Sequence, residues 1–315
     1  MRRDTIGLAA AALLLAACSS GTTVEHIATT ASADPVHDKL AQVLDRGTLV
    51  LFTDPAYPPQ SEVVKSATRP AGTKCLANQL TGPQMTGYDA ETGKAVAKAL
   101  GVEPCFVTPS WTEVTSGNWG DRWDVAWGSG AINADRMSRL YVTLPSYTTP
   151  AVVFVAKSSP IKHLSELSGH PVGACAGCTM QQYLEGTLEL PGVVTTRAFT
   201  PSKIVTYDTE VPGLKAVGAG KLDAFLCSEP VGAGEIAAGV PLRQLPEPAY
   251  QTYKTGYVDQ SSGLSATAFV ARLDKILARL HADGTMARLS EQAFGKDYAT
   301  EAATFDIAAL GQKVS

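Results

Sequence analysis

Arg136 has a residue type and setting that could bind a ligand, because it follows the stretch Gly128-Ser129-Gly130-Ala131 near the predicted start of a helix. The planar guanidinium of arginine holds a carboxylate through two parallel hydrogen bonds. Glycines in the preceding loop let backbone amides approach the same anion. These residues predict an anion-binding site. A solvated surface arginine is the alternative that the residue types leave open.

A second candidate anion site is Gly177-Cys178-Thr179, which precedes another predicted helix. The free N–H groups at a helix N-terminus attract negative charge, and the hydroxyl of Thr179 adds a donor. Thr179 would serve equally well as a plain N-cap, so helix capping alone is the alternative.

Asp54 and Tyr57 lie in the loop after the first predicted strand. Tyr57 would cover the apolar part of a ligand and Asp54 would meet a positive group, although a proline-rich turn explains both residues as well. Four tryptophans gather in one stretch, and a core position is favoured for each because an indole has a large area to bury. One or two of them, with Trp111 as the candidate, would line a pocket: Trp111, Trp119, Trp123 and Trp127.

The N-terminus predicts an export signal. Arg2 and Arg3 precede an apolar run from Ile6 to Ala17 that is too short to span a bilayer. The end of this run, with Cys18 directly after it, matches a bacterial lipoprotein cleavage box, which predicts cleavage before Cys18 and lipid on its thiol. An ordinary signal peptide with a chance cysteine is the alternative. The mature protein is therefore expected to be extracytoplasmic, in the periplasm or on the outer face, and anchored to the membrane by lipid only.

Export would place the remaining cysteines in an oxidising space, where disulfides form. Cys75 and Cys105 would make one bridge, and two of Cys175, Cys178 and Cys227 would make another, which leaves one cysteine free. The Cys-x-x-Cys spacing also fits a redox or zinc motif. No histidine accompanies it and no second such pair occurs, so no metal site and no cofactor is expected.

Length and composition are those of an ordinary globular protein. The 315 residues suit about two domains. The net charge is -4 and no basic stripe stands out, so nucleic acid is not an expected partner. A monomer is expected.

Strands alternate with helices along the chain, which predicts an α/β fold of parallel sheets with helices on both faces. The segment 60–85 interrupts this alternation and is interpreted as an insertion held to the sheet by a Cys75–Cys105 bridge. Strands are predicted at 48–52, 102–107, 123–127, 151–156, 172–174, 203–207 and 224–227. Helices are predicted at 36–44, 90–100, 180–188, 211–219, 272–281 and 287–294.

Six segments occur in an order that resembles the family-3 solute-binding proteins of the polar amino-acid type, over about Gly47 to Gly295. The segments are "GTLVLFTDPAYPP", "GYDAETGKAVAKALGV", "DVAWGSGAINADR", "YTTPAVVFVAKSSPIKHLSELSGHPVGACAGCT", "AVGAGKLDAFLCSEP" and "LHADGTMARLSEQAFG".

The resemblance implies the type II fold of periplasmic binding proteins, with two Rossmann-like lobes joined by a two-strand hinge. Lobe 1 would comprise 47–149 plus 255–315, and lobe 2 would comprise 150–254, after a signal peptide at 1–17 and a tether with a lead-in helix at 18–46. The implied function is that of the substrate-binding component of an ABC importer. It would capture a small polar solute, an amino acid or related carboxylate, in the interlobe cleft and deliver it to a permease with its ATPase.

Three departures from the family pattern bear on the ligand. At the position of Ser228 the family usually carries an aspartate that binds the ligand's ammonium, and Glu229 is adjacent. Ala131 lacks the hydroxyl that is common there, and Gln60 stands where an aromatic residue is common. Ser228 and Glu229 remain candidate ligand contacts, and a ligand with a carboxylate but a different amine, or none, stays open.

Two other classes of function stay open. Periplasmic dehydratases resemble these binders and use a cleft carboxylate as acid or base, for which Glu229, Glu113 and Asp54 are candidates. A ligand-sensing module of the same shape would signal through a separate membrane receptor. The histidines are scattered and no nucleophile has a base beside it, so a binding protein without catalytic activity is favoured.

Overall fold

A computed structural model describes residues 34–191 and 195–315 of the chain. The predicted signal peptide at 1–17, the lipidation site Cys18 and most of the predicted tether lie outside the described residues. The described residues form one compact unit.

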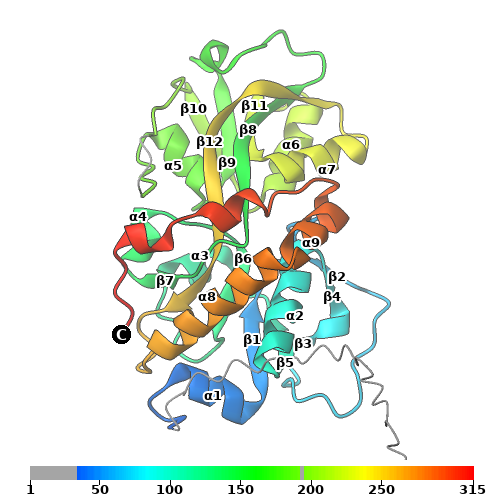
Figure 1. Cartoon of the computed structure of the whole chain (residues 1–315). Helices are drawn as coiled ribbons and strands as arrows, with labels where there is room; N and C mark the ends of the chain where they lie inside the picture. The colour runs from blue at the N-terminus through cyan, green and yellow to red at the C-terminus, as the bar shows by residue number, and fades with distance from the viewer. Residues whose placement is uncertain (1–33, 192–194) are drawn as a thin grey trace, which may run out of the picture. The chain divides into compact units, whose positions relative to one another are not determined.

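Most described strands join one ten-stranded sheet in the order β10-β9-β11-β8-β12-β6-β1-β5-β3, with β7 paired to β12 (Figure 1). A separate hairpin-like pair is formed by β2 (Glu62–Val63) and β4 (Met85–Thr86). The strands of the large sheet are β1 (Thr48–Phe52), β3 (Leu80–Thr81), β5 (Glu103–Val107), β6 (Val125–Ala131), β7 (Leu140–Val142), β8 (Tyr147–Ala156), β9 (Pro171–Cys175), β10 (Lys203–Tyr207), β11 (Ala224–Ser228) and β12 (Leu242–Asp259).

The sheet is mixed, which corrects the expectation of purely parallel pairing. β1 pairs in parallel with β5 and β6, and β9 pairs in parallel with β10 and β11. Between these two parallel groups, β8 and β12 run antiparallel to each other over most of their length. These two long strands therefore connect both groups.

The predicted helices are confirmed, with shifted ends, and two further helices were not predicted: α3 (Trp111–Ser116) and α7 (Glu229–Ala237). None of the described helices is both long and apolar enough to cross a membrane. The others are α1 (Lys39–Arg46), α2 (Tyr88–Leu100), α4 (Ala134–Met137), α5 (Thr179–Glu185), α6 (Glu210–Gly218), α8 (Thr267–Ala282) and α9 (Thr285–Phe294).

Local sequence sets the ends of these helices. α1 begins after Asp38, whose carboxylate accepts a hydrogen bond from Ala41 N at 2.8 Å. α2 ends at Gly101, which has φ of 78° and a left-handed conformation that glycine adopts without strain. The apolar face of α2, with Val96 and Leu100, is buried in the core.

The buried apolar side chains form four clusters that fall into two groups. Two clusters draw on segments before about residue 147 and after about residue 257, as with Phe106 and Phe269. The other two draw on 151–250, as with Phe154 and Tyr183. In Figure 1, α5 lies on one side of strands β8 to β11, and α6 and α7 lie on the other.

The segment 60–85 carries only short strands and lies against β5. Its Cys75 Sγ stands 2.09 Å from Cys105 Sγ, which places the predicted pair at bonding distance. β3 within this segment also pairs with β5, so the segment is tied to the edge of the sheet at two points.

We predict opposite effects for alanine at two glycines of α7. A Cβ at Gly232 would lie 2.1 Å from the ring of Phe154 on β8, whereas a Cβ at Gly234 would meet nothing within 4 Å. Gly232→Ala should destabilise the fold by about 1–3 kcal/mol through overpacking. Gly234→Ala should stabilise it by up to about 1 kcal/mol through helix propensity. Urea unfolding of both variants checks this, and equal effects would show that α7 does not pack on β8 as described.

Candidate functional site

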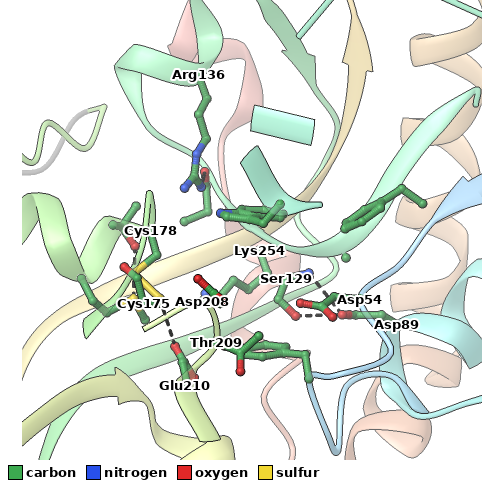
Figure 2. Close-up of a pocket in the computed structure, with 17 residues that line it drawn as sticks. Asp54, Asp89, Ser129, Arg136, Cys175, Cys178, Asp208, Thr209, Glu210 and Lys254 are labelled. Atoms are coloured by element: carbon green, nitrogen blue, oxygen red, sulfur yellow. Dashed lines mark hydrogen bonds between the residues drawn. A yellow bond between two sulfur atoms is a disulfide. The ribbon is translucent and has the colours of Figure 1, made fainter. Parts of the chain in front are cut away.

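A pocket is lined by side chains from both groups of clusters (Figure 2). Its lining residues come from the end of β1 and the loop after it, from α2, α3, β6 and α4, from the end of β9 and the start of α5, from the loop before α6 and its first residue, and from β12. They are Phe52, Asp54, Tyr57, Asp89, Trp111, Gly128, Ser129, Ala131, Arg136, Cys175, Cys178, Thr179, Met180, Asp208, Thr209, Glu210 and Lys254.

Arg136 lines this pocket, and its side chain is almost fully buried, with 2% of its surface exposed. Its Nη1 donates to the Ala131 carbonyl at 3.2 Å and to Tyr257 Oη at 3.0 Å, and its Nη2 donates to the Gly177 carbonyl at 3.2 Å. The guanidinium also lies 5.1 Å from the ring centroid of Trp111. Among the described residues it forms no ion pair with a carboxylate. In the part of the chain that the structure describes, the groups that contact its positive charge are therefore all neutral.

The loop before α5 faces Arg136 with its Gly177 carbonyl. Cys175 Sγ and Cys178 Sγ lie 2.17 Å apart, and both residues line the pocket. Cys227 is a free cysteine and is buried. Thr179 is the first residue of α5, whose N-cap is Cys178, and its hydroxyl accepts from Tyr250 Oη at 3.0 Å.

The first predicted loop also reaches the pocket. Asp54 and Tyr57 line it together with Trp111, while the other three tryptophans of the same stretch are buried in the core. The Tyr57 hydroxyl donates to Ser228 Oγ at 3.0 Å. Gly128 and Ser129 are further lining residues that the sequence predicted.

Three candidate residues do not line the pocket. A Cβ at Gly130 would lie 2.3 Å from the Tyr257 ring, so this glycine serves the packing of Tyr257. Ser228 is fully buried behind Tyr57. Glu229 was expected to contact the ligand, but it is the first residue of α7, and it accepts from Lys296 Nζ at 3.1 Å and Tyr298 Oη at 2.8 Å.

Three charged residues that sequence reasoning missed lie in the pocket and are almost fully buried: Asp89, Glu210 and Lys254, at 3%, 1% and 3% exposure. Asp89 Oδ2 accepts from Ser129 N at 3.1 Å and from Ser129 Oγ at 2.8 Å. Glu210 Oε1 accepts from Ser228 N at 3.4 Å. Among the described residues, no donor reaches Glu210 Oε2, and Lys254 Nζ has no hydrogen bond or ion pair.

Burial dominates the protonation of these groups. It raises the pKa of Asp89 to about 7 and the pKa of Glu210 to about 7, because the charged carboxylate loses its hydration. Burial also lowers the pKa of Lys254 to about 8, while the charges of Glu210 and Asp89 act in the opposite direction. The pocket therefore holds carboxyl groups and an ammonium that titrate near neutral pH.

One signal for Glu210 was present in the sequence. Asp208, Thr209 and Glu210 follow a predicted strand and precede a predicted helix, which is the position where ligands meet α/β sheets. Lys254 had no such signal, because it lies inside a long strand that was not predicted.

Comparisons with known proteins point to one family. The sequence model of the bacterial extracellular solute-binding proteins, family 3, matches residues 49–296. The L-cystine-binding protein TcyJ of Escherichia coli K12 is 23% identical over 265 residues, which covers 82% of this chain and 86% of that protein. The ABC transporter arginine-binding protein 1 of the same organism is 24% identical over 233 residues, which covers 73% of this chain and 88% of that protein.

The fold has a counterpart among solved structures. The crystal structure of the ancestral amino acid-binding protein AncCDT-1, a precursor of cyclohexadienyl dehydratase, superposes with a TM-score of 0.64 at 22% identity. The match covers 82% of this chain and 99% of that one. The predicted fold class, an α/β periplasmic-binding-protein fold of type II, is confirmed.

The raised pKa of Glu210 predicts a pH-dependent cost of folding. A carboxyl whose pKa rises from 4.5 to about 7 on folding lowers the unfolding free energy as pH rises between these values. Glu210→Gln removes this cost. The unfolding free energy of the variant minus that of wild type should therefore increase by on the order of 1–3 kcal/mol between pH 5 and pH 7.5. Urea unfolding of both ligand-free proteins at the two pH values checks this, and a constant difference would contradict it.

Proposed function

The chain belongs to the bacterial extracellular solute-binding proteins of family 3, and we propose that its pocket around Arg136 captures an amino acid or a related small carboxylate for an ABC permease and its ATPase. Relatives that bind L-cystine and L-arginine support an amino acid as the solute. L-Cystine and L-arginine are therefore the first compounds to test.

A single observation carries this proposal, namely that the buried guanidinium of Arg136 lines the pocket and has no carboxylate partner in the part of the chain that the structure describes. Taking a charge out of water is costly unless it is paired. The neutral carbonyls and the hydroxyl around Arg136 compensate only part of that cost. A solute carboxylate would supply the missing negative charge in a setting where a two-pronged hydrogen bond is strong.

We propose that the two groups of buried clusters are two lobes, 47–149 plus 255–315 and 150–254, joined by β8 and β12. The pocket takes residues from both proposed lobes. Between the proposed lobes, Asn133 Nδ2 donates to Gln182 Oε1 at 3.0 Å, and Ala134 N donates to the Glu189 carbonyl at 3.2 Å. These contacts would form when the lobes close and break when they open, and a bound solute would favour the closed form through the contacts that it makes only there.

Family membership places the protein outside the cytoplasm. We further propose that Cys18 carries the lipid that keeps it near its permease, because the sequence before Cys18 fits a lipoprotein signal. In that oxidising space the pairs Cys75–Cys105 and Cys175–Cys178 would be disulfides, in keeping with their sulfur distances. The protein would act as a monomer.

We propose that the protein binds its solute without converting it. Of the three candidate catalytic carboxylates, Glu113 caps α3 and pairs with Arg122, and Glu229 pairs with Lys296. Asp54 alone lines the pocket. The likeness to a dehydratase precursor makes turnover the second candidate function. Mass spectrometry of the bound solute after long incubation would reveal such turnover as a new mass.

Arg136→Lys should weaken solute binding while the fold persists. Lysine keeps the charge but loses the planar pair of donors, and each lost charge-assisted hydrogen bond costs about 1.5–3 kcal/mol, which is about tenfold in affinity or more. Calorimetry with the amino acid that most raises Tm in a thermal-shift screen measures this. Arg139→Lys is the matched control, because Arg139 binds Asp135 outside the pocket. Equal affinities of both variants would remove Arg136 from the site.

Cys18→Ser should release the protein from the membrane fraction of the producing cell. A serine offers no thiol for acylation, and the remaining chain would then behave as an exported soluble domain. Metabolic labelling with a fatty-acid probe, followed by fractionation, measures this, with Cys227→Ser as the control. A membrane-bound and labelled Cys18→Ser protein would show that the anchor lies elsewhere.

A further inference from the structure

Three buried charges of the pocket lack the partners that burial demands. Among the described residues, no carboxylate lies within ion-pair distance of Arg136 or Lys254, and no donor reaches Glu210 Oε2. All three are more than nine-tenths buried and line the same cavity. Unpaired buried charges are costly and rare in proteins, so each of them is a candidate contact for a charged group of the solute.

Glu210 lies beside Ser228, the position at which the family usually carries an aspartate. Ser228, at the end of β11, carries no charge, but its backbone N–H donates to Glu210 Oε1 at 3.4 Å. The side chain of Glu210 thus reaches the end of β11 from the first turn of α6, and its free Oε2 is left for a donor. The Tyr57 hydroxyl, bonded to Ser228 Oγ at 3.0 Å, lies at the same place.

Lys254 and Arg136 are the two basic residues among those that line the cavity. The charge of Arg136 disfavours the ammonium form of Lys254, whereas the charge of Glu210 favours it. In the view of Figure 2, Lys254 lies between Arg136 and Glu210. An anion beside both cations would relieve their mutual repulsion, and a cation beside Glu210 would restore the balance of charge.

We propose that this pocket holds the zwitterionic head of an α-amino acid, with Glu210 as the acceptor for its ammonium group and Lys254 as the second cation, beside Arg136, for its carboxylate. Glu210 would thereby supply the charge that Ser228 lacks, from a different strand–helix loop. This assignment rests on the proposed function, since it names the residues and the solute class of the same site.

The test compares each amino acid with its counterpart that lacks the α-amine. L-Arginine is paired with δ-guanidinovaleric acid and L-cystine with dithiodipropionic acid, and the other natural amino acids are screened with their desamino acids by thermal shift. Calorimetry then measures the affinities of the best pair. Wild type should prefer the amino acid by at least about tenfold, the value of one hydrogen bond to a charged group.

Two variants separate the roles of Glu210 and Lys254. Glu210→Gln should reduce the preference for the amine to less than about threefold while affinity for the desamino acid persists, and Glu210→Asp should restore part of the preference. Lys254→Met should lower the affinity for the amino acid and for its desamino acid by a similar factor, because both compounds carry the carboxylate. Glu235→Gln is the matched control and should behave as wild type, because Glu235 is a buried glutamate on α7 whose Oε2 accepts no hydrogen bond from the described residues and lies 4.0 Å from Lys215 Nζ.

Each other result is decisive. Equal binding of both members by wild type would overturn the zwitterion assignment and leave the proposed carboxylate binding intact. An unchanged preference in Glu210→Gln would remove Glu210 as the ammonium acceptor, and an unchanged affinity in Lys254→Met would remove Lys254. Binding of no amino acid and no desamino acid would overturn the proposed function itself. Ligand-free unfolding curves of every variant show whether a loss of binding reflects a loss of fold. If Glu210→Gln does not fold, the amine preference of Glu210→Asp tests the role of Glu210 instead.

Discussion

The Arg136 guanidinium is buried with no carboxylate partner within residues 34–191 and 195–315, and this is the constraint on which the site depends. Its hydrogen bonds go to the Ala131 and Gly177 carbonyls and to the hydroxyl of Tyr257. Neutral acceptors orient the guanidinium but leave its charge uncompensated. Gly130 belongs to the same arrangement, because only a residue without a side chain lets the Tyr257 ring approach this closely. The fold thus holds a positive charge in a fixed orientation inside a pocket.

The sheet explains how residues far apart in sequence can meet around that charge. β8 and β12 lie between the two parallel groups of strands, with β8 paired to β11 and β12 paired to β6, so they connect the two sets of buried clusters. Arg136 comes from one set, the loop before α5 and Glu210 come from the other, and Lys254 lies on β12 itself. A change in the twist or bend of β8 and β12 would alter the distance between these residues. We therefore expect solute binding to be coupled to closure of the two proposed lobes.

Much of the fold could be predicted from the sequence, because the apolar patterns and turn residues of most segments agree with the helices and strands that they form. β1 and β10 were predicted to the residue, since both are short segments rich in β-branched or apolar residues, bounded by turn residues and without a competing helical pattern. α7 was missed because Pro230, Gly232 and Gly234 read as a loop, although Pro230 is tolerated in the first turn of the helix. β12 was missed because prolines and polar residues interrupt it.

Site residues that belong to a sequence motif could be predicted, whereas those that reach the pocket through tertiary packing could not. Arg136, Asp54, Tyr57 and Thr179 reach the pocket as their motifs indicated. Glu229 was misplaced because its contacts depend on α7, which positions it next to Lys296. Lys254 could not be found, because nothing local distinguishes a lysine at a strand edge from one that points into a buried cavity.

A crystal structure with the amino acid selected by the thermal-shift screen tests the central claim most directly. We expect the solute carboxylate within hydrogen-bond distance of the Arg136 guanidinium, inside the pocket shared by the two groups of buried clusters. A solute bound at another place, with the guanidinium still held only by Ala131, Tyr257 and Gly177, would contradict the account.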